Sequence, residues 1–158
     1  MIVRSQYGND IVEFLPPDAA LDPAIPLTFT VIVAGHNDRT VLIFNTDRNQ
    51  WEAPGGGIEP GESIEECAIR EFMEEACQTA ESVELIGYGR LRFNTRGGLQ
   101  EYCAMFTANV NALQPFTPSE ECTQFLLWDG DESALDGELG PWARAFIAHC
   151  QGRAVSSQ

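Results

Sequence analysis

Apolar and polar positions alternate along the chain in runs that predict several short strands around one central helix. Five runs are rich in β-branched and aromatic residues and suit strands: 27–34, 40–45, 83–94, 99–110 and 123–128. The turn at residues 35–38 joins the first two, and an Arg-Gly-Gly tip joins the third and fourth, so each pair predicts a hairpin. Residues 1–22 add a strand or two, and Pro141 opens a closing amphipathic helix.

The central helix is predicted to begin at Ser63. Ser63 and Glu66, three residues apart, form a capping box, which satisfies free N–H groups of a first helical turn. One arc of the helix is apolar and predicts a face toward the core: Ile64, Ala68, Ile69, Phe72 and Ala76. Glu71, Glu74 and Glu75 share a second arc beside it. This order of strands and helices supports an α+β or α/β class.

The three glutamates of the second arc are an unfavourable arrangement for an isolated helix. Like charges three or four residues apart destabilise a helix by roughly a few tenths of a kcal/mol each. A cation would offset this repulsion, and carboxylate oxygens are ligands that suit Mg²⁺. Arg70, directly before Glu71, can pair with a neighbouring carboxylate and orient it. The pattern therefore indicates a divalent-metal site, and the alternative is a solvated acidic helix after a glycine loop.

The stretch from Gly56 to Gln78 resembles the Nudix (MutT-like) signature, Gly-x5-Glu-x7-Arg-Glu-U-x-Glu-Glu-x-Gly-U, where U is a bulky apolar residue. Seven positions match in register: Gly56, Glu62, Arg70, Glu71, Phe72, Glu74 and Glu75. The last two positions depart, because Cys77 replaces the glycine and Gln78 replaces the apolar residue. A glycine there ordinarily ends the helix in a left-handed conformation, so the departure concerns the exit of the helix and not its acids.

The resemblance implies an α+β fold, an α/β/α sandwich with a central mixed sheet. It also implies a hydrolase that uses Mg²⁺, or Mn²⁺, to split a phosphoanhydride in a nucleoside diphosphate-linked substrate. The implied metal ligands are the main-chain carbonyl of Gly56 and the side chains of Glu71, Glu74, Glu75 and Glu121. Glu120 and Glu101 are the alternatives to Glu121. The implied catalytic residues are Glu71, the first candidate for the general base, Glu74 and Arg70, with Arg70 and Glu62 as orienting groups.

The substrate is less well specified by the sequence. Arg90 and Arg92 lie two apart on a predicted strand, so they share a face and are candidate phosphate contacts. The alternative is that they only offset the acidic surface. The secondary signatures of ADP-ribose, NADH and coenzyme A enzymes of the family are missing, which leaves a (deoxy)nucleoside triphosphate, oxidised forms included, as the leading candidate by elimination. A Nudix-fold module that binds a nucleotide without hydrolysing it is the alternative function.

Composition bounds the remaining expectations. The chain has 158 residues and a formal net charge of −15, and its cations are all arginine. This charge argues against a nucleic acid polymer or an anionic membrane as partner, but not against a small nucleotide. Five cysteines without C-x-x-C pairs favour a reducing, cytoplasmic location, and no apolar run suits a signal peptide or a membrane span. We expect one domain over residues 1–150, a polar tail at 151–158, and a monomer or homodimer.

Overall fold

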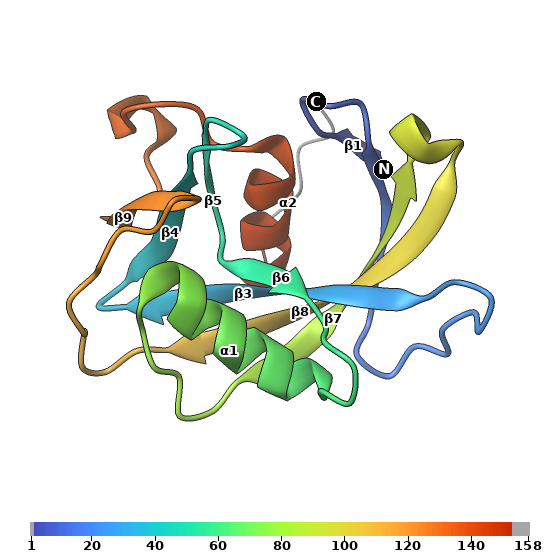
Figure 1. Ribbon diagram of the computed structural model, residues 1–158, viewed down its shortest axis with the longest axis horizontal. Helices are drawn as coiled ribbons and strands as arrows, with labels where there is room; N and C mark the ends of the chain where they lie inside the picture. Colours follow the sequence, from blue (N-terminus) through green and yellow to red (C-terminus); the bar gives the residue numbers. More distant parts are fainter. Residues whose placement is uncertain (1, 153–158) are drawn as a thin grey trace.

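The apolar runs form the strands of one sheet, and a helix packs on each of its faces (Figure 1). The computed structural model describes residues 2–152, so most of the predicted tail at 151–158 lies outside the described residues. The strands are β1 (Val3–Arg4), β2 (Asp10–Leu15), β3 (Leu27–His36), β4 (Arg39–Asn45), β5 (Gln50–Glu52), β6 (Gly55–Gly57), β7 (Glu84–Phe93), β8 (Leu99–Asn109) and β9 (Cys122–Trp128). The helices are α1 (Ile64–Ala76) and α2 (Pro141–Cys150), with 3₁₀ turns η1 (Asn94–Arg96) and η2 (Glu132–Ala134).

The sheet is mixed, as the family resemblance implied. Its strand order is β1-β2-β7-β8-β3-β4-β5, with β6 paired to β3 and β9 paired to β4. The central strands β3 and β8 run parallel, from Leu27 beside Tyr102 to Gly35 beside Asn109. The other pairs are antiparallel, including the predicted hairpin of β7 and β8.

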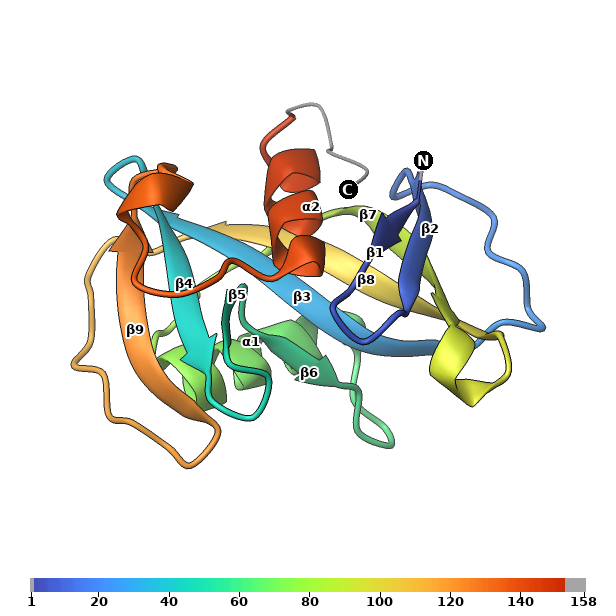
Figure 2. The same ribbon diagram turned by 90° about the horizontal axis from the view of Figure 1, so that it is seen from above.

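The predicted hairpin of β3 and β4 is confirmed only next to its turn. Two residue pairs join these strands, Gly35 with Thr40 and His36 with Arg39. Beyond them, β4 diverges and pairs along its length with β9 and β5. The edge of β3 that β4 leaves is taken by β6, which places the glycines of β6 at the middle of the molecule (Figure 2).

Alternate residues of β3 face the two helices, because successive side chains of a strand point to opposite faces. Ile32 packs in one buried cluster with Phe72 of α1. Val31 packs in a second cluster with Phe146, and Val33 in a third with Ile147, both of α2. The expected α/β/α sandwich of the α+β class is therefore confirmed. Within residues 2–152, no helix combines the length and the apolar character that crossing a membrane requires.

The three glycines before α1 form a strand, where the sequence predicted a glycine-rich turn. Gly57, Gly56 and Gly55 pair antiparallel with residues 29–31 of β3. A Cβ atom at Gly55 would collide with the main-chain carbonyl oxygen of Thr30, so this approach of two backbones requires glycine. Glycines carry no side-chain pattern, and this strand was therefore not visible in the sequence.

Candidate metal and nucleotide site

Helix α1 begins at the predicted cap and presents its acids beside the sheet. The Ser63 side chain accepts a hydrogen bond from the Glu66 N–H, and the Glu66 carboxylate accepts one from the Ser63 N–H. The buried residues of the helix are Cys67, Ala68, Phe72 and Ala76. Ile64 and Ile69, which were predicted on this face, are only half-buried. The helix is thereby fixed in rotation, with Glu71 and Glu75 next to the glycine strand β6 and Glu74 more exposed beside Arg70.

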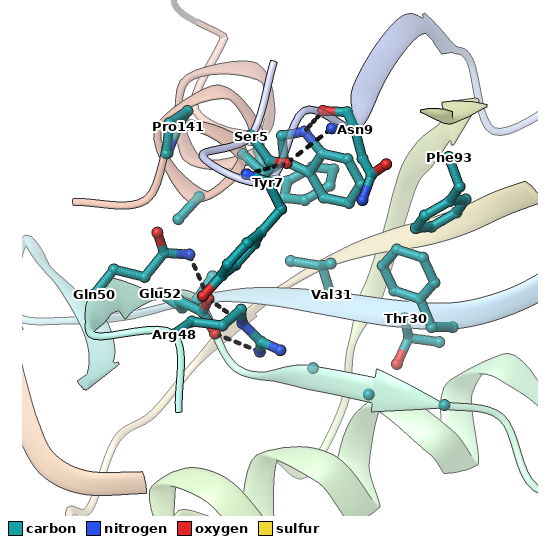
Figure 3. A pocket seen from close by; sticks show the side chains of 18 residues that line it. Ser5, Tyr7, Asn9, Thr30, Val31, Arg48, Gln50, Glu52, Phe93 and Pro141 are labelled. Carbon is teal, nitrogen blue, oxygen red and sulfur yellow. Dashed lines mark hydrogen bonds and ion pairs between the residues drawn. The ribbon is translucent and has the colours of Figure 1, made fainter. Parts of the chain in front are cut away.

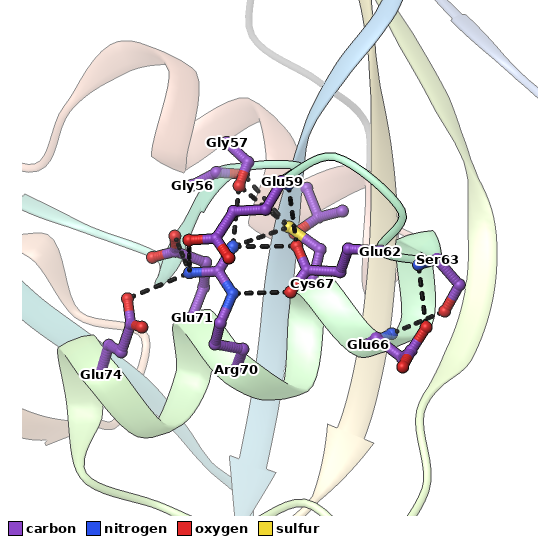
Figure 4. Close-up of polar contacts among 11 residues, drawn as sticks. Gly56, Gly57, Glu59, Glu62, Ser63, Glu66, Cys67, Arg70, Glu71 and Glu74 are labelled. Carbon is purple, nitrogen blue, oxygen red and sulfur yellow. Dashed lines mark hydrogen bonds and ion pairs between the residues drawn. The ribbon is translucent and has the colours of Figure 1, made fainter.

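Arg70 is the centre of an ion-pair network (Figure 4). Its Nε donates to Glu62 at 2.6 Å, and its Nη1 donates to Glu71 at 2.9 Å and to Glu74 at 3.1 Å. Its Nη2 also donates to the Gly57 carbonyl oxygen at 2.8 Å. The hydrogen bonds from Arg70 hold the pKa of Glu62 at about 2. The pairing of Arg70 with its neighbouring carboxylates, as the sequence indicated, orients two of the predicted metal ligands.

Glu71 lies directly against β6. A Cβ atom added at Gly56 would overlap the Glu71 carboxyl group, so only glycine leaves room for this side chain. Burial raises the pKa of Glu71, and the charges of Glu74 and Glu121 act in the same direction, while Arg70 opposes the shift. The predicted ligands Gly56 and Glu71 are therefore in contact.

The acidic group consists of Glu71, Glu74, Glu75 and Glu121. Glu75 is the most enclosed of them. Its Oε1 accepts a hydrogen bond from the Gly55 N–H at 2.8 Å, and Cys122 Sγ lies 3.5 Å from its Oε2. Burial raises its pKa to about 7, and repulsion from Glu71 and Glu121 adds to that effect. The shift therefore has two causes, removal of the carboxylate from water first and like charge second.

Glu121 joins the acidic group from the loop that precedes β9. Asn45 Nδ2 donates to its carboxylate at 3.0 Å, and the Thr46 N–H donates to its main-chain carbonyl at 2.8 Å. Its charge contributes to the raised pKa of both Glu71 and Glu75. The alternative Glu101 is instead held by Thr28 and by Arg96, at 2.7 Å from the latter.

The donor atoms of this group suit a hard divalent cation. Within residues 2–152, no three His, Cys, Asp or Glu side chains already converge on a common point. Glu71 and Glu74 form ion pairs with Arg70, and Glu75 accepts a hydrogen bond from the Gly55 N–H. Carboxylate and carbonyl oxygens are the donors that Mg²⁺ and Mn²⁺ prefer. Repulsion between these carboxylates adds to the effect of burial on the pKa values of Glu71 and Glu75, and a cation would offset that repulsion.

Arg90 and Arg92 lie away from the acids of α1, on the part of β7 that pairs with β2. Arg90 Nε contacts Glu13 at 2.8 Å, and Arg92 Nη2 contacts the buried Asp10 at 2.9 Å. Both guanidinium groups are thus already paired with carboxylates of β2. Their assignment as phosphate contacts stays a prediction.

A cavity of about 400 Å³ lies on the other side of β6 from the helix acids (Figure 3). The strand Gly55–Gly57 forms part of its wall, and Tyr7, Phe29, Phe93 and Trp142 contribute aromatic surface. Tyr7 projects into the cavity from the turn between β1 and β2, toward Arg48 and its partner Glu52 (Figure 3).

Only some of the residues that line this cavity could be identified from the sequence. From the sequence, five aromatic residues are available to stack on a base, with a role in the core as the favoured interpretation: Phe29, Trp51, Phe93, Trp128 and Trp142. Of these, Phe29, Phe93 and Trp142 line the cavity. Tyr7 was not identified at all, because it sits in a polar turn without periodicity.

Comparison with known proteins agrees with this geometry. The NUDIX domain family matches residues 25–150. A putative 8-oxo-dGTP diphosphatase of Bacillus subtilis (strain 168) is 41% identical over 64 residues, which is 40% of this chain and 43% of the relative. An uncharacterized Nudix hydrolase of the same organism, YvcI, is 44% identical over 39 residues, which is 25% of each protein. The chain thus matches less than half the length of these two relatives.

Solved structures of low sequence identity share the fold. The Bacillus subtilis pyrophosphohydrolase BsRppH superposes with a TM-score of 0.70 at 18% identity, covering 90% of this chain and 87% of that one. A NUDIX hydrolase from Nitrosomonas europaea gives a TM-score of 0.68 at 20% identity, covering 80% and 89%. Since the family match alone extends over well more than half of the 158 residues, the chain belongs to the Nudix family.

Proposed function

We propose that this protein is a divalent-metal-dependent hydrolase of a phosphoanhydride bond, acting on a (deoxy)nucleoside triphosphate to release the monophosphate and pyrophosphate. One observation carries the proposal: the acids of α1 and the aromatic cavity lie on opposite sides of the same three-residue strand, Gly55–Gly57. A nucleoside in the cavity would direct its phosphates past β6 to the acids. Cavities of this size, about 300–1,000 Å³, accommodate ligands of nucleoside dimensions.

The residues that would hold the metal are Glu71, Glu74, Glu75 and Glu121, together with the Gly56 carbonyl. When bound, Mg²⁺ or Mn²⁺ neutralises charge on diphosphate oxygens and lowers the pKa of a bound water. Arg70 orients the Glu71 and Glu74 side chains through its ion pairs, and Glu62 fixes Arg70 in turn. Orienting contacts of this kind determine how well ligands are placed.

Proton transfer from the attacking water requires a carboxylate beside the metal. Glu71 is the first candidate for this base, because it is partly buried against Gly56 and its pKa is raised. Glu75 is the alternative, with a pKa of about 7 before metal binds. The Oε1 atom of Glu71 accepts from Arg70 and the Oε1 atom of Glu75 accepts from the Gly55 N–H, which leaves the second oxygen of each carboxylate for a proton.

The substrate class rests on two supports. The missing secondary signatures favour a nucleoside triphosphate, and the relative of 41% identity over 64 residues carries the name of an 8-oxo-dGTP diphosphatase. We include oxidised purine triphosphates in the proposal for this reason. A cytoplasmic location accords with five cysteines that are all free thiols in the described structure.

Chromatographic detection of product nucleotides, together with release of pyrophosphate and phosphate, tests the proposal. The protein is incubated with Mg²⁺ and, separately, with nucleoside triphosphates, 8-oxo-dGTP, ADP-ribose, NADH, dinucleoside polyphosphates and nucleotide sugars. We expect pyrophosphate from one or more triphosphates, and no turnover when EDTA replaces Mg²⁺. Binding of a nucleotide without any product would instead identify the protein as a non-catalytic nucleotide-binding module.

A further inference from the structure

The two residues that depart from the family signature, Cys77 and Gln78, contact the loop that carries Glu121. This loop covers residues 110–121, between β8 and β9, and contains no helix or strand. Loops of this length within a compact domain are uncommon unless they serve a function. Its far end holds Glu121, the only member of the acidic group that α1 does not supply.

Gln78 is fully buried, and its side-chain amide is satisfied by main-chain atoms. Its Nε2 donates to the carbonyl oxygens of Ala76 and Gln114, at 3.0 and 2.9 Å. The Gln114 N–H donates back to Gln78 Oε1 at 2.9 Å. An apolar side chain, which the family signature has at this position, could not make these bonds and would leave polar groups of the loop without their partners.

Cys77 makes a second attachment three residues further along the loop. The Thr117 N–H points to Cys77 Sγ at 3.4 Å, and Sγ lies 3.5 Å from the Thr117 carbonyl oxygen. Cys77 adopts the left-handed conformation, with φ of 58°, that glycine usually supplies at a helix end. The helix therefore keeps the expected exit geometry, at the cost of backbone strain in a non-glycine residue, and gains a side chain that touches the loop.

Together these contacts leave a short span between the helix end and Glu121. Residues 114 and 117 are fixed to α1, and Asn45 and Thr46 hold Glu121 itself at the other end. Ser119 closes a turn onto Cys122 between them. The loop is thus held near both of its ends, beside the end of α1 at residues 114 and 117 and beside β4 at Glu121.

We propose that Gln78, assisted by Cys77, is a positioning residue that sets the place of Glu121 relative to the acids of α1 and thereby the affinity for the divalent metal. This inference rests on the proposed function, in which Glu121 completes the metal site. Neither residue touches the metal ligands of α1; both act through the loop.

The test measures Mn²⁺ affinity by electron paramagnetic resonance, without nucleotide. Gln78→Met keeps the length of the side chain and removes its hydrogen bonds, and we expect Mn²⁺ to bind about tenfold more weakly, as for outer contacts of metal ligands. Gln114→Met is the matched control, because Gln114 contributes only main-chain atoms to these bonds, and the Mn²⁺ affinity of this variant should equal that of the parent.

Cys77→Gly relieves the left-handed strain, so it should keep or raise the thermal unfolding midpoint while still weakening Mn²⁺ binding.

A double-mutant cycle separates positioning from a merely structural role. In a Glu121→Gln background, Gln78→Met should cause no further loss of Mn²⁺ affinity. An equal loss in that background, or unchanged affinity in Gln78→Met, would overturn the proposal. Unchanged affinity in Glu121→Gln alone would overturn it as well, while leaving the assignment of Glu71, Glu74 and Glu75 to be judged by their own variants.

Discussion

At the scale of single residues, environment separates glutamates that the sequence presents alike. Glu62 faces Arg70, and the pKa of its carboxyl falls to about 2. Glu75 is enclosed beside Glu71 and Glu121, and its pKa rises to about 7. The sequence identified both as members of one motif, but it could not show that Arg70 pairs with the first, whereas the second is buried beside other carboxylates.

The raised pKa of Glu75 predicts how stability depends on pH in the metal-free protein. Native Glu75 keeps a proton that the unfolded chain releases near its ordinary value of 4.5, so the native state binds more protons between that pH and about 7. The free energy of unfolding should therefore fall as pH rises through this window, by about 1–3 kcal/mol. Urea unfolding in the presence of EDTA, repeated at several pH values across this window, measures the free energy of unfolding.

Two variants and the metal provide the controls for this pH dependence. Glu75→Gln should remove most of the slope, whereas Glu65→Gln, at an exposed position of the same helix, should retain it. Saturating Mg²⁺ should raise stability most at the alkaline end of the window, because metal binding requires the deprotonated carboxylate. A slope that survives in Glu75→Gln would contradict the assignment.

Tyr7 allows a test of the cavity at the same scale. Removing the ring with Tyr7→Ala should raise KM for the nucleotide about tenfold, since stacking of a base on an aromatic ring contributes about 1–3 kcal/mol. The kcat value should change much less, because Tyr7 lies in the cavity and not among the acids. Leu99→Ala, at a residue of similar exposure outside the cavity, should leave both constants unchanged. Equal KM values for the two variants would exclude the cavity as the nucleoside site.

At the scale of elements, local patterns predicted what local interactions determine. The capping box fixed the start of α1 at Ser63, and β-branched residues marked β3 and β4. The parallel pairing of β3 with β8 and the divergence of β4 were not predictable, because they depend on contacts between distant segments. The cavity was hidden for the same reason, as its walls come from both ends of the chain.

The glycines of β6 yield a prediction about this strand. Gly56→Ala places a methyl group where the Glu71 carboxyl lies, so Glu71 must move and hydrolysis should fall by about two orders of magnitude. Gly57→Ala meets no atom within 4 Å and should keep near-parent activity. Circular dichroism compares the folding of the two variants, and steady-state kinetics compare their activity. Similar activity in the two variants would show that the contact of Gly56 with Glu71 has no part in catalysis.

At the scale of the whole molecule, the fold brings a nucleoside-sized cavity and an acidic helix to the two sides of one strand. The opening of the β3–β4 hairpin makes this possible, because it admits β6 beside β3. A net charge of −15 would repel a polyphosphate without a metal, so hydrolysis should depend on Mg²⁺ even for tightly bound nucleotides.

The most direct measurement of the central claim compares Mg²⁺-dependent pyrophosphate release by the parent, Glu75→Gln and Glu65→Gln. The account predicts that Glu75→Gln keeps the fold and loses several orders of magnitude in kcat, while Glu65→Gln retains parent turnover. Parent-level turnover by a folded Glu75→Gln protein would contradict the claim that the acids of α1 hold the catalytic metal.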